Sequence, residues 1–177
     1  QRLRRNDVQG LGQAVARLMT GPQGADIVAV SLDGWDTHAG QRAQLQTRLT
    51  GLDQLVTGLK DGLGETWSRT AVIVATEFGR TAYSQGGYGD PSAGRDHHGR
   101  CFTVWLAGGG IKGGMEYGKT DDFSYNIVRD PVHIRDLHAT MLHLFGIDHM
   151  RLTYKVGGLD SRLTGVLPAR VIDEVLA

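Results

Sequence analysis

Acidic and histidine side chains follow, or lie just before, three apolar runs of the chain. They are Asp36 and His38, then Glu77, then the consecutive Asp96, His97 and His98. In an extended segment residues i and i+2 point to the same side, so Asp36 and His38 could hold one ion together. Mixed carboxylate and imidazole ligands suit zinc, manganese or iron, whereas calcium prefers oxygen ligands alone. These six residues therefore predict a divalent metal site, with zinc the first choice.

Three arginines, Arg80, Arg95 and Arg100, flank these acidic and histidine residues. Guanidinium groups beside a metal ion could bind a tetrahedral oxyanion, which makes Arg80 and Arg95 candidate substrate-binding residues. Each residue also has a plainer interpretation. Asp36 could be a turn residue, Glu77 a helix cap or a partner of Arg80, and each arginine a surface ion-pair partner. The prediction depends on convergence of the groups, because no single group decides it.

The apolar pattern predicts the elements that would bring these residues together. Period-3.6 repeats predict helices over 7–20, 41–63 and 131–145, with a short last helix at 168–176. Continuous apolar runs predict buried strands over 26–32, 70–76 and 101–107. Helices alternating with such strands are typical of an α/β protein with a mostly parallel sheet. In such sheets ligands bind beyond the carboxyl ends of the strands, where the candidate residues lie.

Composition limits the classes of protein that fit. The 177 residues carry 19 Lys+Arg and 19 Asp+Glu, so the basic surplus that nucleic-acid and anionic-membrane binders need is missing. One cysteine excludes an internal disulfide framework, and no apolar run is long enough for membrane insertion. We expect a single α/β domain over 1–177, with a leading helix and linker at 1–24 and the sheet and metal-site loops at 25–177.

Five segments together resemble the DUF1501 family of the alkaline phosphatase-like superfamily, which also includes sulfatases and phosphodiesterases. They are residues 34–38 (GWDTH), 75–81 (ATEFGRT), 94–98 (GRDHH), 106–114 (LAGGGIKGG) and 134–146 (IRDLHATMLHLFG). The resemblance implies an αβα sandwich with one or two metal ions at the carboxyl edge of its sheet. It also implies that Asp36, His38, Glu77 and Asp96, with His97 or His98, are metal ligands.

The function that the resemblance implies is metal-dependent hydrolysis of phosphate or sulfate esters, with a small-molecule ester as substrate. Two departures from the superfamily pattern matter. Glu77-Phe78 stands where an Asp-His pair is usual, and the sulfatase C-x-P-x-R motif is missing, since Cys101 is followed by Phe-Thr-Val. The catalytic nucleophile is therefore unassigned. The alternative is a non-catalytic metal- or ligand-binding protein of the cell envelope with the same fold.

The resemblance carries further expectations about the whole protein. The superfamily's first strand and nucleophile precede the segments found here, so we expect the chain to be the C-terminal portion of a longer protein. An open sheet edge would seek a partner, which predicts a homodimer or docking of an N-terminal segment. Export to the periplasm or cell surface is expected from the family resemblance alone.

Overall fold

The chain divides into two compact units, which are described separately. The computed structural model describes residues 7–87 and 89–177. The first unit comprises Gln1–Thr70 with Glu77–Phe102, and the second comprises Ala71–Thr76 with Thr103–Ala177. Among the described residues, no helix has the length and apolar character needed to cross a membrane.

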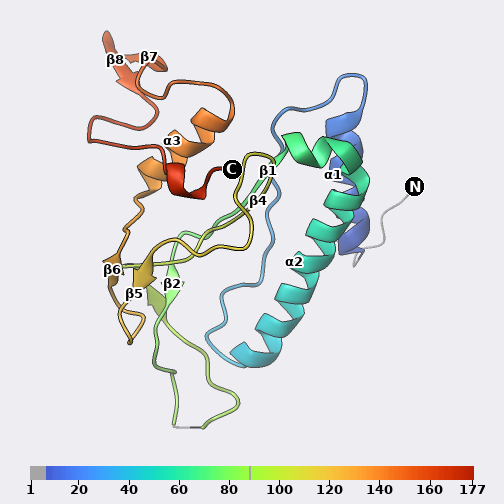
Figure 1. Ribbon diagram of the computed structural model, residues 1–177. Coiled ribbons are helices and arrows are strands. Elements are labelled where there is room, and N and C mark those ends of the chain that lie inside the picture. Colours follow the sequence, from blue (N-terminus) through green and yellow to red (C-terminus); the bar gives the residue numbers. More distant parts are fainter. Residues whose placement is uncertain (1–6, 88) are drawn as a thin grey trace. The chain divides into compact units, whose positions relative to one another are not determined.

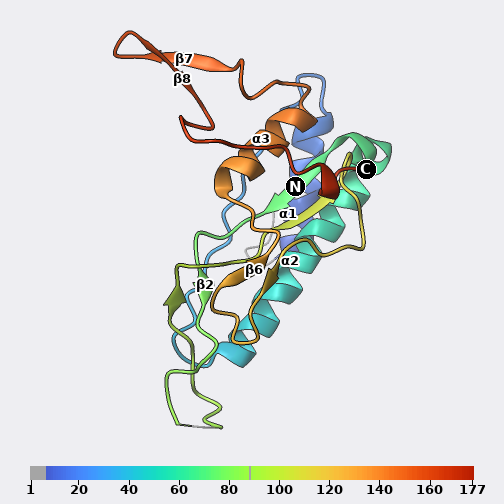
Figure 2. The ribbon, with the colours of Figure 1, turned by 60° about the vertical axis from the view of Figure 1, so that its left-hand side comes forward.

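Two helices form the body of the first unit. Helix α1 spans Val8–Thr20 and helix α2 spans Gln41–Leu63, continued by the 3-10 helix η1 at Gly64–Arg69. Figures 1 and 2 show α1 alongside the C-terminal part of α2. Ala16 of α1 and three leucines of α2 (Leu55, Leu59 and Leu63) are buried. The helices predicted over 7–20 and 41–63 are confirmed, because their leucine periodicity is a local property of the sequence.

Glycine allows α1 and α2 to pack closely. A Cβ atom added to Gly12 would overlap the carbonyl oxygen of Leu55 and lie 2.6 Å from the nitrogen of Leu59. A Cβ added to Gly58 would overlap the carbonyl oxygen of Gln9 in the same way. These contacts are with backbone atoms, which cannot rotate aside. The two helix backbones therefore need glycine at both positions.

Short antiparallel pairings complete the first unit. Strand β2 (Gly79–Arg80) pairs with β3 (His97–His98), and isolated bridges join Ala39 to Ala93 and Gln85 to Gly94. The strand predicted over 26–32 is wrong, since this segment has no regular structure and Ile27 is 75% exposed. A β-branched run becomes a strand only where a neighbouring backbone pairs with it, and no described strand does so.

The second unit contains three two-stranded ladders and one α-helix. Its elements are β1 (Ala71–Val74), β4 (Trp105–Gly108), β5 (Lys119–Thr120), β6 (Ile127–Arg129), α3 (Ile134–Leu144), β7 (Thr153–Val156), β8 (Leu159–Arg162) and the 3-10 helix η2 (Asp173–Val175). The pairs are β1 with β4, β5 with β6 and β7 with β8, each antiparallel. The β7–β8 hairpin is labelled in both ribbon views (Figures 1 and 2).

The chain is therefore a mixed helix and strand protein with small antiparallel sheets, and the mostly parallel sheet expected from the sequence is a wrong prediction for the described residues. The strand predicted over 70–76 is confirmed at its centre, and the one over 101–107 begins only at Trp105. Neither strand contains a buried residue, so the predicted burial is wrong. An apolar run also does not encode the direction of a strand's partner. The last predicted helix, 168–176, is reduced to η2.

Helix α3 begins three residues later than the predicted start at residue 131. His133 is its N-cap and Asp136 accepts a hydrogen bond from the His133 backbone N–H, which together form a capping box. The hydroxyl of the buried Thr140 donates to the Asp136 carbonyl at 2.7 Å and accepts from the Ile172 N–H at 2.9 Å. This single hydroxyl fixes the C-terminal segment of the chain against α3.

Substituting Gly12→Ala is expected to destabilise the helix pair by about 1–3 kcal/mol, the usual cost of forcing extra volume into a packed contact. Urea unfolding followed by far-ultraviolet circular dichroism measures this change. Gly51→Ala is the matched control, because a Cβ there meets nothing within 4 Å. This control should gain up to about 1 kcal/mol of helix propensity. Equal effects of both substitutions would contradict the close packing.

Substituting Thr140→Val keeps the shape of the side chain but leaves the Ile172 N–H without its acceptor. We expect a loss of about 1–3 kcal/mol, the cost of a buried unsatisfied donor, together with faster amide exchange at Ile172. Thr153→Val, at an exposed position of β7, should change the stability by less than about 0.5 kcal/mol. Unchanged exchange at Ile172 in the Thr140 variant would show that the hydroxyl does not hold this segment.

Candidate metal centre

Backbone contacts hold two segments of the first unit together and so build the site. The bridge between Ala39 and Ala93 is joined by a hydrogen bond from the Arg95 N–H to the Thr37 carbonyl at 3.4 Å. A Cβ added to Gly94 would overlap the carbonyl groups of Thr37 and His38. Glycine at position 94 therefore lets the segment that carries His97 approach the loop that carries Asp36 and His38.

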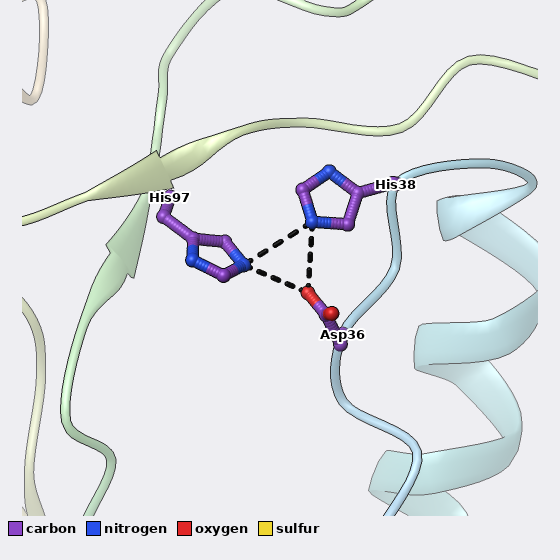
Figure 3. Close-up of side chains that lie close together, drawn as sticks. All are labelled: Asp36, His38 and His97. Atoms are coloured by element: carbon purple, nitrogen blue, oxygen red, sulfur yellow. Dashed lines mark hydrogen bonds and ion pairs between the residues drawn. The ribbon is translucent and has the colours of Figure 1, made fainter.

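Three side chains from these segments meet at one point. His97 Nε2 lies 2.8 Å from Asp36 Oδ1, His38 Nε2 lies 3.0 Å from the same oxygen, and the two Nε2 atoms are 3.2 Å apart (Figure 3). Asp36 and His38 extend from the loop before α2, and His97 from β3. The side chains are 63%, 43% and 47% exposed, respectively, so the point where they meet is open to solvent.

The chemistry of this donor set fits a divalent transition metal. Zinc bonds of about 2.0–2.1 Å in a tetrahedron place the ligand atoms about 3.3 Å apart, and the three separations are only slightly shorter. Iron also uses a set of two imidazoles and one carboxylate, which leaves other coordination positions open. Among the described residues, Asp36, His38 and His97 form a group whose ligand atoms lie close enough together to share one ion.

Arg80 holds the carboxylate of this group in place. Its guanidinium donates to Asp36 Oδ1 at 2.8 Å, to the Trp35 carbonyl at 2.9 Å and to the Arg95 carbonyl at 2.8 Å. The hydrogen bond from His97, followed by the one from Arg80, lowers the pKa of Asp36 from 3.8 to about 2. Asp36 is therefore an anion at any physiological pH, as a metal ligand must be.

The ring of Phe78 positions His97. The two rings stack with centroids 3.8 Å apart and an interplanar angle of 16°, and the Arg80 guanidinium lies 5.3 Å from the Phe78 centroid. No pattern in the sequence predicted a role for Phe78. A stacking contact between residues 19 positions apart leaves no local pattern in the sequence.

The six predicted metal ligands divide into two groups. Asp36, His38 and His97 come together, whereas Glu77, Asp96 and His98 lie outside the described group of three. Adjacent strand residues face opposite sides, so the strand that presents His97 turns His98 away, and His98 is buried. Asp96 lies on the other side of the His38 ring, with Oδ1 3.6 Å from Nδ1. Glu77 is exposed.

The two predicted substrate-binding arginines differ in their contacts. The Arg80 side chain is 16% exposed and already serves three protein acceptors. Arg95 contributes backbone groups to the site, accepting from Arg80 and donating to Thr37, and its side chain is exposed. Of the two, Arg95 has the side chain more accessible to a ligand.

The fold and site define a mixed helix and strand protein with an exposed cluster of two histidines and one aspartate. Residues 4–176 match the family described as "Protein of unknown function (DUF1501)". The chain belongs to this family. No curated protein and no solved structure matches it.

The lowered pKa of Asp36 gives stability a defined pH dependence. Because the folded pKa of about 2 is below the ordinary 3.8, the stabilisation is complete above pH 3.8 and is lost as the pH falls toward 2. Asp36→Asn should therefore flatten the pH dependence of unfolding in this window, measured with chelator present. A carboxyl carbon titration by NMR that places Asp36 at or above 3.8 would contradict the contacts with His97 and Arg80.

Proposed function

We propose that this protein is a metal-dependent hydrolase of phosphate or sulfate esters, with Asp36, His38 and His97 as the metal ligands. The observation that carries the proposal is the meeting of three ligand atoms, within 3.2 Å of one another, at a solvent-open point. Structural metal sites use all four ligand positions, whereas catalytic sites keep a position open for water or substrate. Three protein ligands at an exposed point match the second type.

Zinc is the first choice of ion, and manganese or iron would suit the same ligands. When bound, such an ion would polarise an ester oxygen and lower the pKa of the attacking group. The side chains around it have separate roles. Arg80 orients the Asp36 carboxylate, Phe78 orients the His97 ring, and the exposed Arg95 is the candidate to bind the non-bridging oxygens of the ester.

Placement in the alkaline phosphatase-like superfamily is part of the proposal. It is supported by the order in which the acidic and histidine segments occur, 34–38, 75–81 and 94–98, and by the contact between the first and third of these. Export from the cell belongs to the same placement, as an expectation from the superfamily.

A non-catalytic metal- or ligand-binding role is the alternative, and one observation favours it. The loop of residues 34–40 has a single hydroxyl, that of Thr37, and Thr37 is 1% exposed. This hydroxyl is not available to attack an ester. Hydrolysis at this site therefore depends on water or on a group outside this loop, whereas binding needs neither.

Elemental analysis of the purified chain should find about one zinc, manganese or iron per chain, since three protein ligands are enough for tight binding. Asp36→Ala and His97→Ala should lose the metal. Asp33→Ala and His143→Ala are matched controls, because both side chains are exposed and outside the cluster. These controls should keep the metal content of the wild type.

Turnover then separates the two functions. Metal-dependent hydrolysis of an aryl phosphate or aryl sulfate, lost in Asp36→Ala and kept in His143→Ala, would support the hydrolase. Retained metal without turnover of either ester would favour the binding role. A chain that holds none of the three metals would contradict both the hydrolase and the metal-binding role.

A further inference from the structure

We propose that Gln85 is the positioning residue of His38, holding the imidazole as the Nδ1–H tautomer so that Nε2 is free to bind the metal. This role rests on the metal centre proposed above and extends it to a residue that offers no ligand itself. Gln85 lies outside the three segments whose residue types suggested a site, so no sequence pattern pointed to it.

The two nitrogens of His38 face different partners. Nε2 lies 3.0 Å from Asp36 Oδ1 and 3.2 Å from His97 Nε2, which are the other two ligand atoms. Nδ1 lies 3.2 Å from Gln85 Oε1 and 3.6 Å from Asp96 Oδ1. Both atoms near Nδ1 are oxygens that accept hydrogen bonds, and Asp36 Oδ1 is an acceptor on the Nε2 side. An ion at the meeting point would take the Nε2 lone pair, so the metal-binding arrangement places the proton on Nδ1. A neutral ring then presents its lone pair at Nε2.

Gln85 is itself fixed by the backbone that builds the site. Its N–H donates to the Gly94 carbonyl at 2.8 Å, and the two residues form an antiparallel bridge. Gly94 is in turn the residue whose backbone presses against the carbonyl groups of Thr37 and His38. One rigid set of backbone contacts therefore sets the positions of both the Gln85 amide and the His38 ring.

The same geometry gives Asp96 a different role from the one its sequence position suggested. Its Oδ1 is 3.6 Å from His38 Nδ1, beyond hydrogen-bond range, and its backbone carbonyl accepts from the Thr81 N–H at 3.0 Å. Asp96 adds negative potential on the Nδ1 side, which also favours a proton there. Gln85, which is closer, makes the directional contact. Metal-bound histidines commonly donate their second N–H in this way, to a carboxylate or an amide or backbone oxygen.

The test combines a tautomer measurement with metal affinity on the full chain. In zinc-loaded chain labelled with ¹⁵N-histidine, long-range ¹H–¹⁵N correlation at a pH of about 8, where imidazole is neutral, should show the His38 proton on Nδ1. His38→Gln assigns the signals. In the metal-free chain, Gln85→Leu should shift the ring toward the Nε2–H form relative to the wild type, and Gln85→Glu, which keeps an acceptor oxygen, should not.

Zinc affinity, measured by competition with a chromophoric chelator, should fall about 10–100-fold in Gln85→Leu, the usual cost of losing such a partner. Gln85→Glu should restore it. Gln46→Leu, the same change on an exposed face of α2, should leave it unchanged. A merely structural Gln85 would lower the thermal midpoint of the metal-free chain without changing the tautomer, and this outcome would overturn the role.

Two failures are distinguishable. If the wild type binds zinc but Gln85→Leu binds it equally well, or if the His38 proton lies on Nε2 in the zinc-loaded wild type, the positioning role is wrong and the metal centre stands. If the wild type binds no zinc, manganese or iron, the metal centre itself is wrong, and the role of Gln85 as a positioner of a metal ligand is wrong with it.

Discussion

The candidate site depends on one close approach of two backbone segments. Gly94 lies so near the Thr37 and His38 carbonyls that any side chain at position 94 would overlap them. The Ala39–Ala93 bridge and the Gln85–Gly94 bridge flank this contact. Because backbone atoms make it, the distance between the Asp36 loop and β3 does not depend on side-chain rotamers. The three ligand atoms meet because the two segments are held at this spacing.

Each of the three candidate ligand side chains is supported by a different neighbouring residue. Each residue that could bind an ion has a ligand atom at the meeting point and a further contact with one supporting neighbour. Arg80 holds the Asp36 carboxylate, Phe78 covers the face of His97, and Gln85 faces the second nitrogen of His38. Each ligand side chain thus has a different kind of support: an ion pair, a stacked ring and a hydrogen bond. Such support is what keeps ligand geometry fixed in an exposed site.

Patterns that are local in the sequence predicted the helix α2 and the proximity of the Asp36 and His38 side chains. The leucine repeat fixed the bounds of α2, and the i, i+2 spacing of Asp36 and His38 correctly put their side chains together. The choice between His97 and His98 depends on which side of β3 faces the loop: His97 reaches Asp36, whereas His98 is buried. No pattern in residues 94–98 contains that information.

Contacts distant in sequence explain the other failures of prediction. The segment 26–32 has the composition of a strand but lacks a described partner, and β1 pairs antiparallel with β4 because partner direction is a property of the whole chain. Phe78 contacts His97, which lies 19 positions away in the sequence, and Gln85 contacts His38, which lies 47 positions away. Neither residue type is a metal ligand, so a search for ligand types alone passes over both.

Formal charge connects the proposed ion with the proposed substrate. The charged groups around the cluster are the carboxylates of Asp36 and Asp96 and the guanidinium of Arg80. The two imidazoles are neutral when they bind a metal. The protein groups alone therefore carry a net negative charge, which attracts a cation. A divalent ion reverses this sign. A site that is anionic without its metal and cationic with it would select first the ion and then an anionic ester, because each binding step supplies the charge that the next one needs.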